Sequence, residues 1–176
     1  DPPKTPIETA KAAVEEAWGN ITVTNNYRLD NLEADMAAAV RDALEKAGID
    51  GENVTVDVPY DGYKQTFASA NEEGSFSATV KIAIGGESAE ITVERTFDLI
   101  ACGTDWTLDR YGKLTVSSAA GLSDWGTNKD IFGNSVDVIS AEIADEVTDL
   151  GSVFQGHINL TKITIPSGVT SIGRDA

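Results

Sequence analysis

Residues 143–151 of this chain read IADEVTDLG, and residues 165–173 read IPSGVTSIG. The two stretches agree at an offset of 22, where Ile, Val, Thr, a second aliphatic residue and Gly recur in the same order. Aliphatic positions that recur with a period of about 20–29 residues are typical of solenoid proteins, in which each turn of the chain contributes a short strand. The repeat therefore predicts stacked strands, which we expect at residues 138–139 and 163–165.

The sequence before the repeat predicts a β-hairpin. Residues 106–108 (WTL) and 114–116 (LTV) alternate apolar and polar side chains around a Gly-containing turn, which places the apolar side chains of both segments on one face. From Leu99 onward the chain is rich in Gly, Ser and Thr. We therefore divide it into a domain of residues 1–98 and a domain of residues 99–176.

Two amphipathic helices are predicted at the start of the first domain. The capping sequence TPIE opens the first helix, which we expect over about residues 5–18. The second is expected over about residues 31–47, with Asp30 as its N-cap. Its apolar stripe, which we expect to pack in the core, consists of Leu32, Met36, Val40 and Leu44.

After these helices the period of the apolar residues changes from 3.6 to 2, which is typical of strands. Alternating runs at residues 54–60, 76–84 and 89–97 predict an antiparallel sheet, and a further short strand is predicted at 21–23. The first domain is therefore expected to be α+β, with two helices on one face of an antiparallel sheet.

The last two of these runs are separated by two glycines, Gly85 and Gly86. A Gly-Gly pair suits the two-residue loop of a β-hairpin, and the length of the loop sets the register of the strands. In that register Lys81 lies opposite Glu90 on the solvent face of the sheet.

Two stretches of the second domain resemble a known family. Residues 102–125 (CGTDWTLDRYGKLTVSSAAGLSDW) and 145–176 (DEVTDLGSVFQGHINLTKITIPSGVTSIGRDA) are similar to the N-terminal cap and first repeats of the BspA-like leucine-rich repeat proteins. The repeats of that family read approximately LTSVTIPSGVTSIGDYAF, and residues 160–173 match them almost position by position. The first copy departs from the pattern, because Ala144 stands opposite Pro166.

This resemblance covers about residues 101–176 and implies a mostly β cap followed by the start of a leucine-rich-repeat solenoid. It also implies an extracellular location on a bacterial cell surface, where such solenoids act in adhesion to host proteins, other bacteria or carbohydrates. The order of helices and strands in residues 1–98 resembles a small module repeated in surface proteins of gut bacteria, which implies a spacer or presentation role. Neither resemblance supplies a catalytic residue or a cofactor.

The charge of the chain excludes some partners. It carries 13 Lys and Arg against 29 Asp and Glu, a formal net charge of −16. Such a chain does not neutralise nucleic-acid phosphates or bind anionic membranes through basic residues. No apolar run approaches the length of about 20 residues that spans a membrane, so we expect no membrane insertion. Residues 1–6 (DPPKTP) predict an extended linker, and we interpret the chain as a processed piece of a longer one.

The residues suited to catalysis are few. Cys102 is the sole thiol and His157 the sole imidazole, and we expect structural roles for both. Carboxylates are abundant, but no pair is marked out as the acid and base of a hydrolase. The segment 124–130 (DWGTNKD) places oxygen ligands in a loop but lacks the terminal Glu of a calcium-binding EF-hand. We therefore predict no enzyme activity, no metal site and no cofactor.

Two functions remain open from the sequence. The first is a non-catalytic part of a bacterial surface protein that contacts a host or bacterial protein or a glycan through its leucine-rich-repeat region. The second is a carbohydrate-binding module, in which three aromatic residues of the cap would stack on sugar rings. These tentative ligand-binding residues are Trp106, Tyr111 and Trp125.

Overall fold

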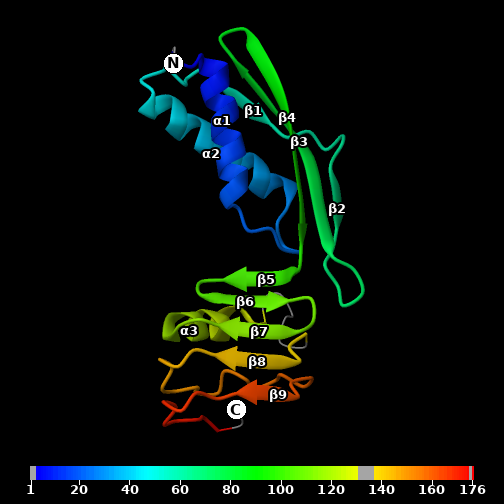
Figure 1. Ribbon diagram of the computed structural model, residues 1–176, viewed down its shortest axis with the longest axis vertical. Helices are drawn as coiled ribbons and strands as arrows, with labels where there is room; N and C mark the ends of the chain where they lie inside the picture. Colours follow the sequence, from blue (N-terminus) through cyan, green and yellow to red (C-terminus); the bar gives the residue numbers. More distant parts are fainter. Residues whose placement is uncertain (1–2, 131–136, 175) are drawn as a thin grey trace. The chain divides into compact units, whose positions relative to one another are not determined.

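The computed structural model describes residues 3–130, 137–174 and 176, and among these it contains three helices and nine strands. The predicted α+β class is confirmed (Figure 1). The chain divides into two compact units. Unit 1 comprises the residues up to Thr66 together with Ser75–Phe97, and unit 2 comprises Phe67–Gly74 and the residues from Asp98 onward. The first two residues of the expected N-terminal linker lie outside the described part of the chain.

Unit 1 contains the helices α1 (Pro6–Asn20) and α2 (Leu29–Lys46). The capping box at the start of α1 is confirmed, because the backbone N–H of Thr5 donates to the Glu8 carboxylate at 2.8 Å and the Thr5 hydroxyl accepts from the Glu8 backbone. The N-cap predicted for α2 is wrong. The helix begins two residues earlier, and the backbone N–H of its N-cap, Arg28, donates to the Asn31 side chain at 2.8 Å. Asp30 instead lies in the first turn, where its charge favours the helix dipole.

The sheet of unit 1 consists of β1 (Thr55–Asp57), β2 (Lys64–Thr66), β3 (Gly74–Ile84) and β4 (Glu87–Phe97). β1 and β2 pair with β3 in antiparallel register, and β4 pairs with β3 as well. The predicted hairpin is confirmed by the ion pair between Lys81 and Glu90, whose charged atoms lie 3.0 Å apart.

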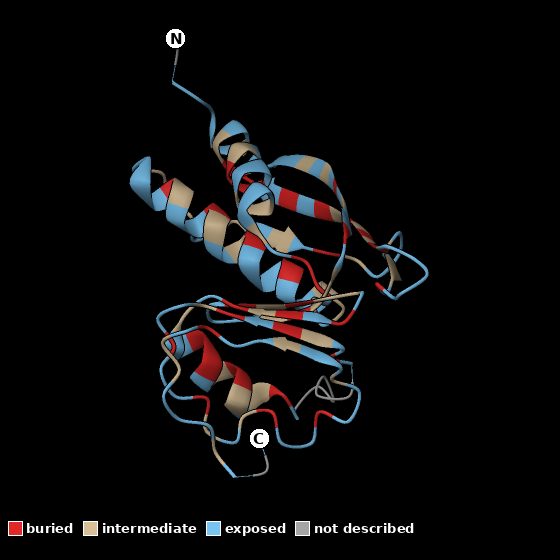
Figure 2. Ribbon diagram, turned by 60° about the horizontal axis from the view of Figure 1, so that its bottom comes forward, coloured by how far each residue is buried: buried red, intermediate tan, exposed pale blue. Residues whose placement is uncertain are grey.

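The core of unit 1 lies between the helices and one face of this sheet. The apolar stripe of α2 is confirmed, since all four of its side chains are fully buried. α2 contacts α1 and β1, and Figure 2 shows the buried segments along α1 and α2. The other buried core residues of α1 and β3 are Ala10, Ala13, Val14, Phe76, Ala78, Val80, Ile82 and Ile84.

The strand predicted at residues 21–23 is absent from unit 1, where this segment has no regular structure. The guanidinium group of Arg95 donates to the Trp18 carbonyl at 2.6 Å and also to the Ile21 carbonyl. The Ile21 carbonyl, which a neighbouring strand would otherwise pair, is therefore bound by a side chain. The strand predicted over 54–60 is also shorter than expected, since Pro59 has no backbone N–H to donate to a ladder.

Unit 2 contains a sheet in the spatial order β5-β6-β7-β8-β9. β5, β6 and β7 pair in antiparallel fashion, whereas β7 with β8 and β8 with β9 are parallel. The predicted hairpin of β6 and β7 is confirmed, with Trp106 opposite Val116 and Leu108 opposite Leu114. The bounds of these strands are β5 Leu99–Gly103, β6 Trp106–Asp109, β7 Lys113–Val116, β8 Ser140–Ile143 and β9 Lys162–Thr164.

Residues that are 22 positions apart pair with each other in unit 2. Ala141 lies opposite Ile163 in the β8–β9 ladder, and Asp149 forms an isolated parallel bridge with Ser171. β8 was predicted at residues 138–139, which is wrong, because the strand begins at Ser140. The period found in the sequence is thus also the register of this parallel pairing.

The helix α3 (Ala119–Asn128) was not predicted. Its N-cap is Ser118, whose hydroxyl accepts from the backbone N–H of Gly121 at 2.9 Å. Its two glycines lower the intrinsic helix propensity, so the helix depends on the packing of Leu122 and Trp125 in the core. The path of the chain after this helix is incomplete, since residues 131–136 lie outside the described residues.

Candidate interaction surface

The sheet of unit 2 has one face in the core and one face of polar side chains. The inner positions of neighbouring strands, such as Leu114 and Ala141, are almost fully buried. The outer positions alternate with them, and none is buried. We call this set the outer sheet face, and it consists of Cys102, Thr107, Lys113, Thr115, Ser140, Glu142, Lys162 and Thr164.

One row of the outer sheet face crosses all five strands of unit 2. The registers place Cys102 beside Thr107, Thr107 beside Thr115, Thr115 beside Glu142 and Glu142 beside Thr164. Neighbouring side chains in such a row are about 5 Å apart, so they can contact one ligand together. The row offers hydroxyl groups and one carboxylate, which are hydrogen-bonding groups for a polar partner.

An ion pair joins two strands on the outer sheet face. The Lys113 ammonium lies 2.6 Å from the Glu142 carboxylate, and both side chains remain about half exposed. The hydrogen bond between them raises the pKa of Lys113 and lowers the pKa of Glu142. Both groups therefore stay charged at neutral pH, and the pair places the Glu142 carboxylate beside the Lys113 ammonium on this face.

The tentative aromatic binding residues do not form an exposed platform. Trp106 is 2% exposed and Trp125 is 0% exposed, and their rings meet edge to face with centroids 4.9 Å apart. Neither indole presents a face on which a sugar could stack. Tyr111 is 59% exposed, and the guanidinium carbon of Arg110 lies 4.5 Å from the centroid of its ring. Only Tyr111 of the three is accessible to a ligand.

The carboxylate of Asp124 has a structural role in unit 2. It accepts hydrogen bonds from the indole N–H of Trp106 at 2.6 Å and from the backbone N–H of Thr104 at 3.0 Å. Its other oxygen accepts from Asn128 at 3.0 Å. Because protein donors occupy both oxygens, Asp124 ties α3 to the turn between β5 and β6. Among the described residues there is no group of three or more His, Cys, Asp or Glu side chains that could hold a metal ion.

Two basic side chains fix the loop that follows β8. The Lys129 ammonium donates to the carbonyls of Val153 at 2.7 Å and Gln155 at 2.9 Å. The Nδ1 atom of His157 lies 2.8 Å from the Phe154 carbonyl, so it carries the proton that makes this hydrogen bond. Three consecutive carbonyls are thus bound by side chains, and both Lys129 and His157 are buried.

Neither Cys102 nor His157 has the environment of a catalytic group. Burial raises the pKa of the Cys102 thiol, which disfavours the nucleophilic thiolate. Burial also lowers the pKa of His157, although the hydrogen bond to Phe154 acts in the opposite direction. The side chain of His157 is 7% exposed, so a substrate does not reach it.

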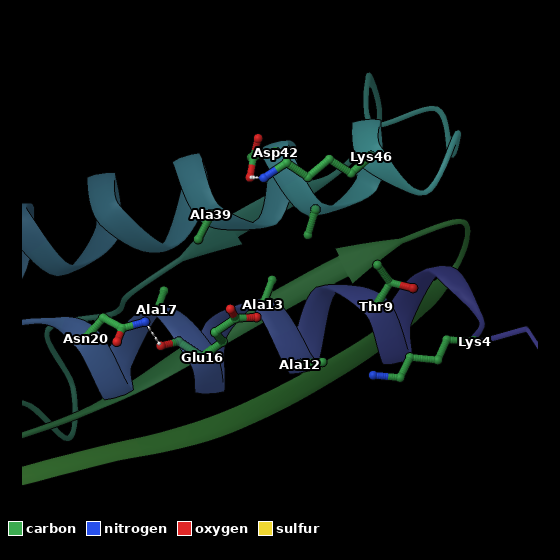
Figure 3. A pocket seen from close by; sticks show the side chains of 11 residues that line it. Lys4, Thr9, Ala12, Ala13, Glu16, Ala17, Asn20, Ala39, Asp42 and Lys46 are labelled. Atoms are coloured by element: carbon green, nitrogen blue, oxygen red, sulfur yellow. Dashed lines mark hydrogen bonds and ion pairs between the residues drawn. The ribbon is translucent and has the colours of Figure 1, made fainter.

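A groove lies between α1 and α2 in unit 1 (Figure 3). It has a volume of about 390 Å³, and its floor is formed largely by alanine side chains of both helices, labelled in part in the figure. At its rim Lys46 forms an ion pair with Asp42, with the charged atoms 2.6 Å apart. Alanine side chains are too short to fill the space between the two helices. Their small size therefore explains the groove, and no ligand is needed to account for it.

Comparison with known proteins finds no family model, no curated protein and no solved structure that matches this chain. Within the described residues, no helix is both long enough and apolar enough to span a membrane. The assignment of a function therefore depends on the geometry of the surface and on the internal repeat.

Sequence analysis identified part of the outer sheet face only indirectly. The alternation in the β6–β7 hairpin already separated Thr107 and Thr115 from the apolar side chains. Glu142 and Thr164 were not singled out, because their place beside Thr115 depends on the parallel pairing of β8 with β7 and β9. The alternation of polar residues could be recognised in the sequence, but the register between distant strands could not.

Proposed function

We propose that this chain is a non-catalytic part of a bacterial cell-surface protein, and that it binds a host or bacterial protein or a glycan through the outer sheet face. The observation that carries the proposal is the uncovered row of polar side chains from five strands. Flat, polar faces of this kind suit recognition of another macromolecule, whereas enzyme sites are mostly concave. The Lys113–Glu142 pair gives the face a fixed charge pattern that discriminates between partners.

The repeat supports the assignment of unit 2 to a BspA-like leucine-rich repeat. Thr170 donates its backbone N–H to the Thr148 carbonyl at 2.8 Å, and Gly173 donates to Gly151 at 2.6 Å. Each of these pairs joins residues that are 22 positions apart. A Cβ atom on Gly173 would overlap the backbone carbonyl of Gly151, which explains why this repeat position is glycine. In this proposal unit 2 is the cap and first turns of a solenoid on the outside of a bacterium.

Unit 1 serves as a spacer in this proposal. The exposed surfaces of its helices carry an excess of acidic side chains, including Glu15, Glu33 and Glu45. Like charges on an exposed surface favour solubility and oppose self-association. The segment Phe67–Gly74 belongs to unit 2 but lies in the chain between two parts of unit 1. Because truncation would therefore cut into both units, the spacer role and the binding role are best separated by substitutions in the whole chain.

The proposal is tested with the whole chain immobilised and exposed to a panel of extracellular-matrix proteins and to a glycan array. We expect at least one partner whose binding falls about tenfold or more when Glu142→Lys reverses the charge on the outer sheet face, because like charges then meet at a contact. Glu33→Lys on α2 is the matched control, since it makes the same charge change at an exposed position of unit 1.

The two variants give distinct outcomes for the proposal. Binding that is lost with Glu142→Lys and kept with Glu33→Lys supports recognition by the outer sheet face. Equal loss with both variants, or no loss with either, contradicts it. Binding lost only with Glu33→Lys assigns recognition to unit 1.

A further inference from the structure

Two polar atoms in the core of unit 2 have no hydrogen-bond partner among the described residues. They are the indole Nε1 of Trp125 and the imidazole Nε2 of His157. Both side chains are almost fully buried, so bulk solvent does not satisfy them. A buried polar atom without a partner is costly, and folded proteins leave few of them. Both atoms therefore need a partner that the described side chains and backbone do not supply.

The two atoms have complementary hydrogen-bonding roles. The indole N–H of Trp125 can only donate. In His157 the proton lies on Nδ1, which donates to the Phe154 carbonyl at 2.8 Å, and burial keeps the imidazole neutral by lowering its pKa, so Nε2 is an acceptor. The two rings are neighbours, with centroids 5.6 Å apart and planes tilted by 51°. A donor and an acceptor thus lie on adjoining rings without a bond between them.

The ammonium group of Lys129 is a third polar group next to this pair. It donates to the Val153 and Gln155 carbonyls, which uses two of its three N–H groups. The Gln155 carbonyl and the Lys129 charge both act on the His157 imidazole, so the ammonium lies close to this ring. One N–H group of Lys129 is therefore available to a further acceptor beside His157.

A hollow in the surface of unit 2 gives solvent a route to these groups. It has a volume of about 460 Å³, and it lies between α3 and residues 149–153. Lys129 and Val153 are among the residues that line it. Because Lys129 belongs both to this lining and to the buried polar groups, a small molecule from solvent has a short path to them.

The chemistry of the three groups selects the molecule that they would hold together. The N–H groups of Trp125 and Lys129 disfavour a cation, and the lone pair on Nε2 of His157 disfavours an anion. A neutral molecule that accepts two hydrogen bonds and donates one satisfies all three groups. Water has these properties, and a buried water typically makes about three hydrogen bonds to polar groups that otherwise lack a partner.

We propose that unit 2 holds one buried water molecule between the end of α3 and the loop of residues 153–157. The water accepts from the Trp125 indole and from the Lys129 ammonium, and it donates to Nε2 of His157. It thereby ties the helix to the loop through side chains that are covered from bulk solvent. The inference does not rest on the proposed function, because none of these residues belongs to the outer sheet face.

The test measures magnetisation transfer from water to the indole N–H groups of the whole chain by NMR. We expect a cross-peak at the Trp125 indole, with opposite signs in the NOE and ROE spectra, which separates a bound water from proton exchange. The Trp106 indole is the internal control, since it is also buried but donates to Asp124 at 2.6 Å. Because a hydrogen-bonded proton lies about 2 Å from its acceptor and the transfer falls steeply with distance, the Trp106 cross-peak should be about tenfold weaker or absent. A Trp125 cross-peak no stronger than that of Trp106 overturns the inference.

A second NMR measurement tests the acceptor. Long-range ¹⁵N spectra at neutral pH should show a protonated Nδ1 and an unprotonated Nε2 in His157. A proton on Nε2 would overturn the inference, because the water would then have only donors around it.

A crystal structure of the whole chain, grown with bromide, identifies the bound molecule. We expect an electron-density peak within about 3 Å of Nε1 of Trp125 and Nε2 of His157, with no anomalous signal. An anomalous peak at this place would show that the groups hold a halide ion. That result overturns the inference, and so does a direct contact between the two nitrogen atoms or the absence of density between them.

Discussion

Removal of the Asp124 carboxylate should destabilise unit 2 selectively. In the folded chain one oxygen of Asp124 accepts from the Trp106 indole N–H at 2.6 Å and from the Thr104 backbone N–H at 3.0 Å. Asp124→Ala removes this shared acceptor, together with the oxygen that accepts from Asn128. Trp106 is 2% exposed, so its indole N–H is left without a partner in the core, whereas the backbone of Thr104 is exposed and can bond to water.

The size of the effect follows from these two environments. A hydrogen bond to a charged acceptor contributes about 1.5–3 kcal/mol, and an orphaned buried donor costs about 1–3 kcal/mol. Since Thr104 regains a bond to water, we expect Asp124→Ala to lower the free energy of unfolding of unit 2 by about 2–3 kcal/mol. At an m-value of about 1–1.5 kcal/mol/M in urea, the midpoint falls by about 2 M. Asp124→Asn keeps an acceptor without the charge, and its loss should be about half as large.

The assay is urea unfolding followed by tryptophan fluorescence in a Trp18→Phe background. In this background the remaining tryptophans, Trp106 and Trp125, both report on unit 2. Ser123→Ala is the control, because it changes an exposed side chain of α3 next to Asp124 and should cost less than about 0.5 kcal/mol. An Asp124→Ala midpoint within error of the control would refute the assigned role of this carboxylate.

Two further predictions concern the same unit. Burial lowers the pKa of His157 from its usual value of 6.5, so the fold favours the neutral imidazole. Stability of unit 2 should therefore be complete above about pH 6.5 and decrease as the pH falls below it, and His157→Gln should flatten this part of the urea midpoint plotted against pH; an unchanged slope contradicts the prediction. Gly173→Ala should loosen the pairing of Gly173 with Gly151 and speed amide exchange there about tenfold or more. Alanine at Gly19, where a Cβ meets nothing within 4 Å, is its control, and equal effects of the two would be inconsistent with the close approach.

Local patterns predicted the parts of the fold that depend on local chemistry. The α2 stripe and the Gly85-Gly86 loop are short-range features, and each determines an element without a distant partner. The start of α2 was misplaced, because Asp30 suits an N-cap and a first helical turn equally well. The hydrogen bond from the backbone N–H of Arg28 to the Asn31 side chain, which marks the observed start of the helix, is known only from the structure.

The parts that escaped prediction depend on contacts between distant residues. β8 has the sequence SAEI, whose alternation is too short to outweigh the more apolar Val138-Ile139 next to it, and its position is set by pairing with β7. α3 contains two glycines and becomes helical because Trp125 packs against Trp106. Because both rings are buried in this contact, Trp106 and Trp125 are not accessible to a ligand. An exposed aromatic and a buried one have the same sequence pattern when their partner lies far along the chain.

The alternation of inner and outer side chains in unit 2 has an evolutionary consequence. A substitution at Thr107, Thr115 or Thr164 changes one point of a regular array and leaves the volume of the core unaltered. Mutations there escape the selection for stability that constrains Leu108 and Leu114. Relatives of this chain would therefore diversify the outer sheet face one position at a time while they inherit the same scaffold. Sequence comparison among such relatives should show rapid change at the outer positions and slow change at the inner ones.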